Sequence, residues 1–132
     1  ALLAVSEDTG IDLLWGIGGT PEGVLAASAI KCLGGEIIGK LWPRNEEERT
    51  AALEAGYDLD RVLTSNDLVD GDDVFVSGTG VTDGDLLDGV RRGKDFATTE
   101  SLVMRSRSGT VRKVGARHDR TKLREITGGI YG

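Results

Sequence analysis

The sequence has few of the residues from which many catalytic and structural sites are built. It contains one cysteine, one histidine and two prolines among 132 residues. A single cysteine, Cys32, cannot form an internal disulfide, which favours a cytosolic, cytoplasmic setting. His118 has no second histidine or nearby cysteine to complete a zinc site or a Cys–His dyad, so it is expected to be a surface residue at a strand end.

Long apolar runs and excess positive charge are also missing. No segment approaches the length of a membrane span, so no membrane partner is expected. The net charge is −6, which argues against a nucleic-acid surface and against binding to anionic membranes. Hydrophobic residues make up 39% and charged residues 29% of the chain, as in soluble globular proteins. The length suits one domain, residues 1–132, with a single core.

The chain alternates apolar runs with helical patterns, and many of its twenty glycines stand where one element ends. This order predicts an α/β layered domain with a mixed sheet. The predicted elements are a buried strand Ile11–Trp15, a helix Pro21–Leu33 ended by Gly34-Gly35, a strand Glu36–Trp42, a surface helix from Asn45 to about Ala55, a strand Val74–Ser77, and a hairpin Thr98–Arg117.

Shorter features are expected between and after these elements. Ser65 or Asn66 is predicted to cap one helical turn, and Leu86, Leu87 and Val90 to lie on a short helix. The segment 121–132 is expected to start as a helix and then fray. Trp15 and Trp42 fall in strand patterns and are predicted to be core residues.

The hairpin is predicted to turn on two residues, Ser108 and Gly109. With that register, Leu102, Met104 and Val111 share one face, and Val103, Arg105, Arg107, Arg112 and Val114 share the other. Arg105 would then lie opposite Arg112, which is unfavourable unless that face is solvated or meets an anion. A solvated face is the simpler interpretation.

A glycine-rich turn, Gly16–Gly23, joins the first predicted strand to the first helix. Thr20 suits the N-cap position, Pro21 the first helical position and Glu22 the first turn. Free N–H groups at a helix start suit a phosphate, and a divalent cation would let the Glu22 carboxylate lie beside that phosphate. Alternatively, Glu22 only favours the helix dipole. The turn lacks the lysine of a P-loop and the glycine spacing of a dinucleotide fingerprint.

A second acidic glycine-rich segment, Asp83-Gly84-Asp85, follows the strand Val74–Ser77. Ligands of α/β sheets often bind at such strand ends, so these carboxylates are a second candidate site. The alternative is a helix N-cap followed by a turn aspartate. The segment has too few carboxylates to be a calcium loop.

Five segments together resemble one family, the class II (GlpX-type) fructose-1,6-bisphosphatases. The segments are Trp15-Gly-Ile-Gly-Gly-Thr-Pro-Glu-Gly-Val24, Lys31-Cys-Leu-Gly-Gly-Glu36, Leu53-Glu-Ala-Gly-Tyr-Asp58, Thr79-Gly-Val-Thr-Asp-Gly-Asp-Leu-Leu87 and Thr98-Thr-Glu-Ser-Leu-Val-Met-Arg-Ser-Arg-Ser-Gly-Thr-Val-Arg112. The resemblance covers nearly the whole chain but only the C-terminal part of that family. Ala1 to Val5 also look like the end of a helix, so an N-terminal half is expected upstream.

The resemblance implies a metal-dependent phosphatase with a fold like the lithium-sensitive sugar-phosphatase superfamily. Its activity would be hydrolysis of the 1-phosphate of fructose 1,6-bisphosphate in gluconeogenesis, with sedoheptulose 1,7-bisphosphate as a further substrate of some members. By resemblance, Glu22 is a ligand for Mn²⁺ or Mg²⁺ and Gly19 contacts substrate. No catalytic residue falls in this chain, and the upstream Asp-Gly-Asp role is not transferred to Asp83 and Asp85.

These implications predict an inactive fragment of an active enzyme, whose partners are the N-terminal half, the substrate and further copies in a homo-oligomer. Two other functions stay open. The chain could be a non-catalytic module that binds sugar phosphate or metal through Glu22, or an assembly domain that docks the missing half.

Overall fold

The computed structural model describes residues 2–6 and 9–128, which form both helices and strands. The α/β class predicted from the sequence is therefore confirmed. In chain order the elements are η1 (Leu2–Val5), α1 (Thr20–Cys32), β1 (Ile38–Gly39), α2 (Glu46–Glu54), β2 (Leu63–Thr64), α3 (Ser65–Leu68), β3 (Phe75–Thr79), β4 (Arg91–Arg92), β5 (Phe96–Arg105), β6 (Thr110–Asp119) and α4 (Arg120–Ile126).

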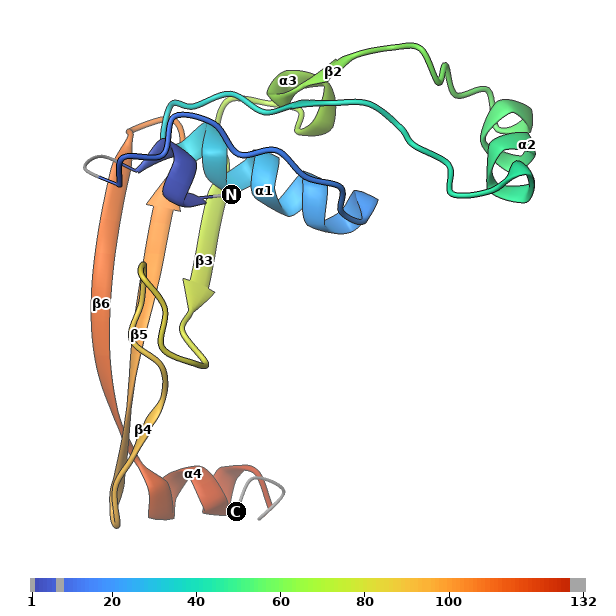
Figure 1. Ribbon diagram of the computed structural model, residues 1–132. Helices are drawn as coiled ribbons and strands as arrows, with labels where there is room; N and C mark the ends of the chain where they lie inside the picture. Colours follow the sequence, from blue (N-terminus) through green and yellow to red (C-terminus); the bar gives the residue numbers. More distant parts are fainter. Residues whose placement is uncertain (1, 7–8, 129–132) are drawn as a thin grey trace.

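The main sheet is built on the long hairpin of β5 and β6 (Figure 1). On the other edge of β5, β3 pairs with the end nearest the hairpin turn and β4 with the opposite end. All strand pairs in the described part of the chain are antiparallel, so the parallel pairing of a mixed sheet is not among them.

The hairpin closes through four residues, 106–109, and not through the predicted two. Ser106 explains the difference, because its hydroxyl accepts from the N–H of Val74 at 2.8 Å and donates to the carbonyl of Asp72 at 2.8 Å. These bonds hold Ser106 against the segment before β3 and outside the ladder between β5 and β6. Arg105 therefore lies opposite Thr110, so the predicted Arg105–Arg112 pair is wrong. The register differs by two residues, which leaves every strand side chain on its predicted face.

Helix α1 packs on one end of the main sheet and forms the core there. Ala29 and Cys32 of the helix are buried against Met104 of β5. The helix ends as predicted: Gly34 has a φ of +75°, and the N–H of Gly35 donates to the carbonyl of Ile30 at 3.1 Å. This is the Schellman arrangement, for which a glycine is favoured.

The segment before α1 does not form the predicted buried strand. Residues 10–18 have no regular secondary structure, and the side chain of Trp15 is 90% exposed. Strand formation requires a neighbouring strand, and none of the described strands pairs with this segment. Trp42 is also 72% exposed, so the prediction that both tryptophans are core residues is wrong for this chain.

Residues 40–62, here called the arm, extend away from the sheet and carry α2 at their far end (Figure 1). Asn45 caps α2 by accepting from the N–H of Glu48 at 2.8 Å, and the helix ends before Gly56, whose φ is +82°. As predicted, α2 is a surface helix, with no buried residue. The predicted strand Glu36–Trp42 is reduced to the two residues of β1, which pair with β2 where the arm leaves the body.

Three local predictions need correction or qualification. The cap of α3 is Thr64, which forms a capping box with Asp67, and not Ser65 or Asn66. The segment around Leu86 and Leu87 is irregular, not helical. The predicted C-terminal helix exists as α4, whereas the predicted fraying of residues 129–132 lies outside the described residues.

The accessible surface of the chain is unusually large for its mass. It measures 9843 Å², whereas a compact monomer of 14.0 kDa exposes about 6,700 Å². The buried apolar residues of the described chain are Ala27, Ala29, Ile30, Cys32, Leu59 and Met104. No helix in the described part of the chain is long and apolar enough to span a membrane. Much of the apolar surface of this chain is therefore not covered by the chain itself.

Candidate functional site

The glycine-rich turn leads an extended, exposed segment directly into the start of α1. Gly19, with φ −67° and ψ 153°, is the N-cap of the helix, so Thr20 begins the helix one residue earlier than predicted. Gly19 has no side chain with which to cap the first turn. The first N–H groups of α1 therefore have no side-chain cap and are available to an anion.

The two residues predicted to form the site, Gly19 and Glu22, lie against each other. A β-carbon built on Gly19 would collide with the Oε2 atom of Glu22. By contrast, a β-carbon on Gly16 or Gly18 would have no atom within 4 Å. Of these three glycines in the turn, only Gly19 is therefore required for the position of the Glu22 side chain.

Glu22 is the acidic residue of the first turn of α1, and its side chain is exposed. A carboxylate there favours the helix dipole and also offers hard oxygen ligands to Mn²⁺ or Mg²⁺. Within the described residues, no three His, Cys, Asp or Glu side chains cluster as metal ligands. Because such a cation needs about six oxygen ligands, the donor set of this chain fits one part of a metal site and not a whole one.

The second acidic segment is a closed loop and not a helix cap. The Asp83 carboxylate accepts from the N–H of Gly89 at 2.9 Å and pairs with Arg91 at 2.8 Å. These two contacts, the backbone bond first, hold the pKa of Asp83 below its usual range. A β-carbon on Gly80 or Gly89 would collide with backbone atoms across the loop. Asp83 therefore stabilises the loop, and the predicted helix N-cap role is wrong.

The arginines of the hairpin take part in a local ion-pair group. Arg105 donates to both carboxylate oxygens of Asp73, at 2.7 and 2.6 Å, and its guanidinium lies 4.7 Å from the ring centre of Phe75. Arg107 lies 3.9 Å from the same carboxylate. The hydrogen bonds from Arg105 are the main reason that the pKa of Asp73 is lowered. The Arg105 guanidinium is therefore paired with a carboxylate of the protein itself.

Polar residues of the segments that resemble the phosphatase family also have structural roles. Lys31 donates to the carbonyls of Val69 and Gly71 at 3.1 and 2.7 Å, which ties α1 to the loop before β3. The Glu36 carboxylate accepts from the N–H of Ser65 at 2.7 Å. Glu100 accepts from the N–H of Asp88 at 2.8 Å. Lys31, Glu36 and Glu100 are each hydrogen-bonded within the protein, and these bonds explain the three residues without a role in ligand binding.

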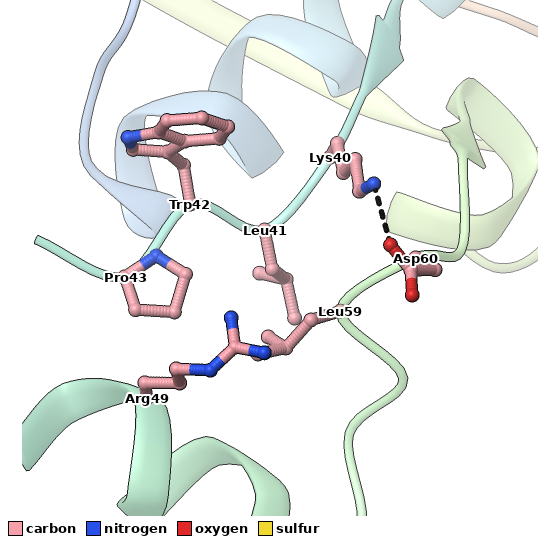
Figure 2. A pocket seen from close by; sticks show the side chains of 7 residues that line it. All are labelled: Lys40, Leu41, Trp42, Pro43, Arg49, Leu59 and Asp60. Atoms are coloured by element: carbon pink, nitrogen blue, oxygen red, sulfur yellow. Dashed lines mark hydrogen bonds and ion pairs between the residues drawn. The ribbon is translucent and has the colours of Figure 1, made fainter. Parts of the chain in front are cut away.

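A shallow cavity that sequence reasoning missed lies within the arm, between its two extended segments and the start of α2 (Figure 2). Its lining residues are Lys40, Leu41, Trp42, Pro43, Arg49, Leu59 and Asp60. Lys40 and Asp60 pair across it at 2.9 Å. The cavity has two cations and one paired carboxylate but no nucleophile. No motif could have revealed it, because the residues come from two separate segments and α2.

Cys32 and His118 have ordinary structural environments. Cys32 is 3% exposed, and burial raises the pKa of its thiol. His118, in β6, is half-buried, and its Nε2 lies 2.9 Å from the hydroxyl of Thr99. The Cys32 thiol donates to the carbonyl of Val74 at 3.5 Å, so each of the two side chains has a polar partner within the protein.

Comparison with known proteins identifies the class of protein. A sequence model of a phosphatase family matches residues 1–118 of this chain. That family is described as bacterial fructose-1,6-bisphosphatase, glpX-encoded. Since the match covers most of the chain, the chain belongs to this family.

Curated relatives agree with this assignment. The fructose-1,6-bisphosphatase class 2 of Haemophilus influenzae is 41% identical over 133 aligned residues, and the alignment covers 89% of this chain. The fructose-1,6-bisphosphatase 1 class 2 of Escherichia coli K12 is 37% identical over 131 residues, again 89% of this chain. In both comparisons the chain spans 39% of the length of the relative.

Proposed function

We propose that the intact protein is a metal-dependent phosphatase that hydrolyses the 1-phosphate of fructose 1,6-bisphosphate. The observation that carries this proposal is the family match over residues 1–118. The contact between Gly19 and Glu22 supports it, because the two residues assigned by resemblance lie together at the start of one helix. The remaining three-fifths of the relatives' length would supply the other catalytic groups.

In this proposal the start of α1 performs two tasks. Glu22 contributes a carboxylate ligand to Mn²⁺ or Mg²⁺, and the missing side chain at Gly19 leaves room for that carboxylate and for a sugar phosphate. When bound, a divalent cation supplies a nucleophilic water near neutral pH and neutralises the charge of the phosphoryl oxygens. The uncapped N–H groups of α1 add positive potential on the same side.

Further parts of the proposal concern the whole protein. It would act in the cytoplasm in gluconeogenesis, as a homo-oligomer, and sedoheptulose 1,7-bisphosphate would be a second substrate. The fold of the intact protein would resemble the lithium-sensitive sugar phosphatases. The 132-residue chain alone would have no meaningful activity, because Glu22 alone cannot hold the cation.

The test is phosphate release from fructose 1,6-bisphosphate with Mn²⁺, measured on the intact protein. Glu22→Gln keeps the size of the side chain but removes its charge, and we expect turnover to fall by about 100-fold or more. Glu47→Gln is the matched control, because Glu47 is an exposed glutamate in the first turn of another helix, α2. Unchanged turnover in Glu22→Gln would reduce Glu22 to a residue that only favours the helix dipole.

The non-catalytic alternative predicts a different pair of results. An intact protein without turnover, together with calorimetric binding of Mn²⁺ or fructose 1,6-bisphosphate by the 132-residue chain, would support a binding module. Turnover by the intact protein and no binding by the chain would support the enzyme.

A further inference from the structure

Residues 11–17, which end inside the glycine-rich turn, have the alternating side-chain pattern of a strand with one continuous apolar row. Alternate residues from Ile11 to Ile17 are Ile, Leu, Trp and Ile, whereas Asp12, Leu14 and Gly16 occupy the positions between them. The apolar row is exposed along its length: Leu13 is 78%, Trp15 90% and Ile17 83% exposed. A row of large apolar side chains open to solvent marks an interaction surface.

The backbone of this segment is also available for pairing. Residues 11–17 make no backbone hydrogen bond to another described residue and belong to neither sheet. An extended stretch of seven residues spans roughly 23 Å, the length of an ordinary strand. Its unpaired N–H and C=O groups can therefore accept a neighbouring strand on either edge.

The amount of exposed surface indicates the size of the partner. The chain exposes roughly 3,000 Å² more than a compact monomer of its mass. A standard protein interface buries only about 800 Å² on each side. One contact with a second copy would therefore leave most of the excess uncovered. The relatives provide a larger partner, because this chain spans only 39% of their length.

We propose that residues 11–17 form a β-strand in the intact protein, and that the rest of the same polypeptide supplies the adjoining strand and the apolar layer over Leu13, Trp15 and Ile17. This inference rests on the proposed function in one respect: the added strand would bring Glu22 to the remaining metal ligands. Glu22 follows Ile17 by five residues, so pairing of the segment fixes the position of the turn that carries Gly19 and Glu22.

Hydrogen–deuterium exchange on the intact protein tests this inference directly. We expect amides in residues 11–17 to exchange at least about 100-fold more slowly than in an unstructured peptide, as in a paired strand. Exchange at the unstructured rate would overturn the proposal. Loss of the protection on dilution to a monomer would also overturn it, because a second copy would then be the partner.

Variants at Trp15 test the apolar layer. Trp15→Phe keeps a large apolar ring, and we expect it to retain the slow exchange of residues 11–17. In Trp15→Glu, we expect the amides of residues 11–17 to exchange at least about tenfold faster than in the wild type, or the protein to be unfolded. Thr50→Glu is the control, since Thr50 is a polar residue on the exposed surface of α2. Equal exchange of the segment in Trp15→Glu and the wild type would contradict a covering layer.

Hydrogen exchange and phosphate release test the strand and the proposed activity separately. Protected amides in a protein that releases no phosphate would support the strand and reject the phosphatase. Phosphate release with freely exchanging amides in residues 11–17 would support the phosphatase and reject the strand.

Discussion

The carboxylate of Glu22 lies over the α-carbon of Gly19, in the space that any other residue's β-carbon would occupy. Gly19 is also the N-cap of α1, and its carbonyl accepts from the N–H of Gly23 at 3.0 Å. The start of the helix and the position of its first acidic side chain therefore depend on the same glycine. This dependence gives the first prediction.

Gly19→Ala is expected to displace the Glu22 side chain without unfolding α1. The φ and ψ of Gly19 suit alanine, so the free energy of unfolding should change by less than about 1 kcal/mol. If Glu22 binds the metal, its displacement should lower Mn²⁺-dependent turnover of the intact protein by about 100-fold. Gly18→Ala is the control, because its new methyl group meets nothing within 4 Å. Equal loss in both variants would contradict this role of Gly19.

The pairing of Asp73 with Arg105 predicts a pH dependence. The pKa of Asp73 is lowered in the folded state, mainly by the Arg105 hydrogen bonds, so this stabilisation is present above about pH 3.9 and is lost as the pH falls through the folded-state pKa. Carbon-13 titration of the carboxyl group should give a lowered midpoint that rises in Arg105→Gln. Arg107→Gln should raise it less, because Arg107 lies 3.9 Å away. Equal midpoints in the two variants would refute this assignment.

Asn45→Ala is expected to destabilise α2 locally. The substitution removes the cap on the N–H of Glu48 and should cost about 1 kcal/mol. That cost speeds hydrogen exchange of the α2 amides by about fivefold. Exchange in β5 should not change, because α2 packs against no other helix or strand to a substantial extent. Asn66→Ala, at an exposed residue of α3, serves as the control. Faster exchange throughout the protein would contradict a local effect.

Met104→Ala is expected to destabilise the core between α1 and the sheet. Met104 is 2% exposed and lies against Ala29 and Cys32, so its truncation leaves a cavity. The free energy of unfolding in urea should fall by about 2–5 kcal/mol. Val81→Ala, at an exposed side chain, should lower it by less than about 0.5 kcal/mol. Similar losses in the two variants would show that Met104 is not a core residue.

The features predicted correctly from sequence depend on neighbours within a few residues. The ends of α1 and α2 were predicted because Gly34 and Gly56 adopt positive φ values that favour glycine. The faces of the hairpin were predicted correctly because the observed register differs from the predicted one by two residues, and a shift by an even number keeps each side chain on the same face. The turn itself was predicted wrongly, because the two side-chain hydrogen bonds of Ser106 are made to a segment more than thirty residues earlier in the sequence.

Whether Trp15 and Trp42 are buried or exposed could not be predicted from the sequence of this chain alone. The apolar pattern around Trp15 gives the periodicity of a strand but not the identity of the strand that pairs with it. The candidate site shows the same limit. Gly19 and Glu22 lie together because they are three residues apart at one helix end, whereas completing a metal site requires groups that the described residues do not bring together.

The arm provides a position at which another domain can be inserted into this protein. The turn of residues 55–57 after α2 is exposed, and α2 contributes no buried side chain to the core. An inserted affinity tag or fluorescent domain disturbs a host least where the interrupted backbone is exposed and contributes little packing. The segment around Gly56 is therefore a suitable position for such an insertion, well separated in the chain from the glycine-rich turn that carries Glu22.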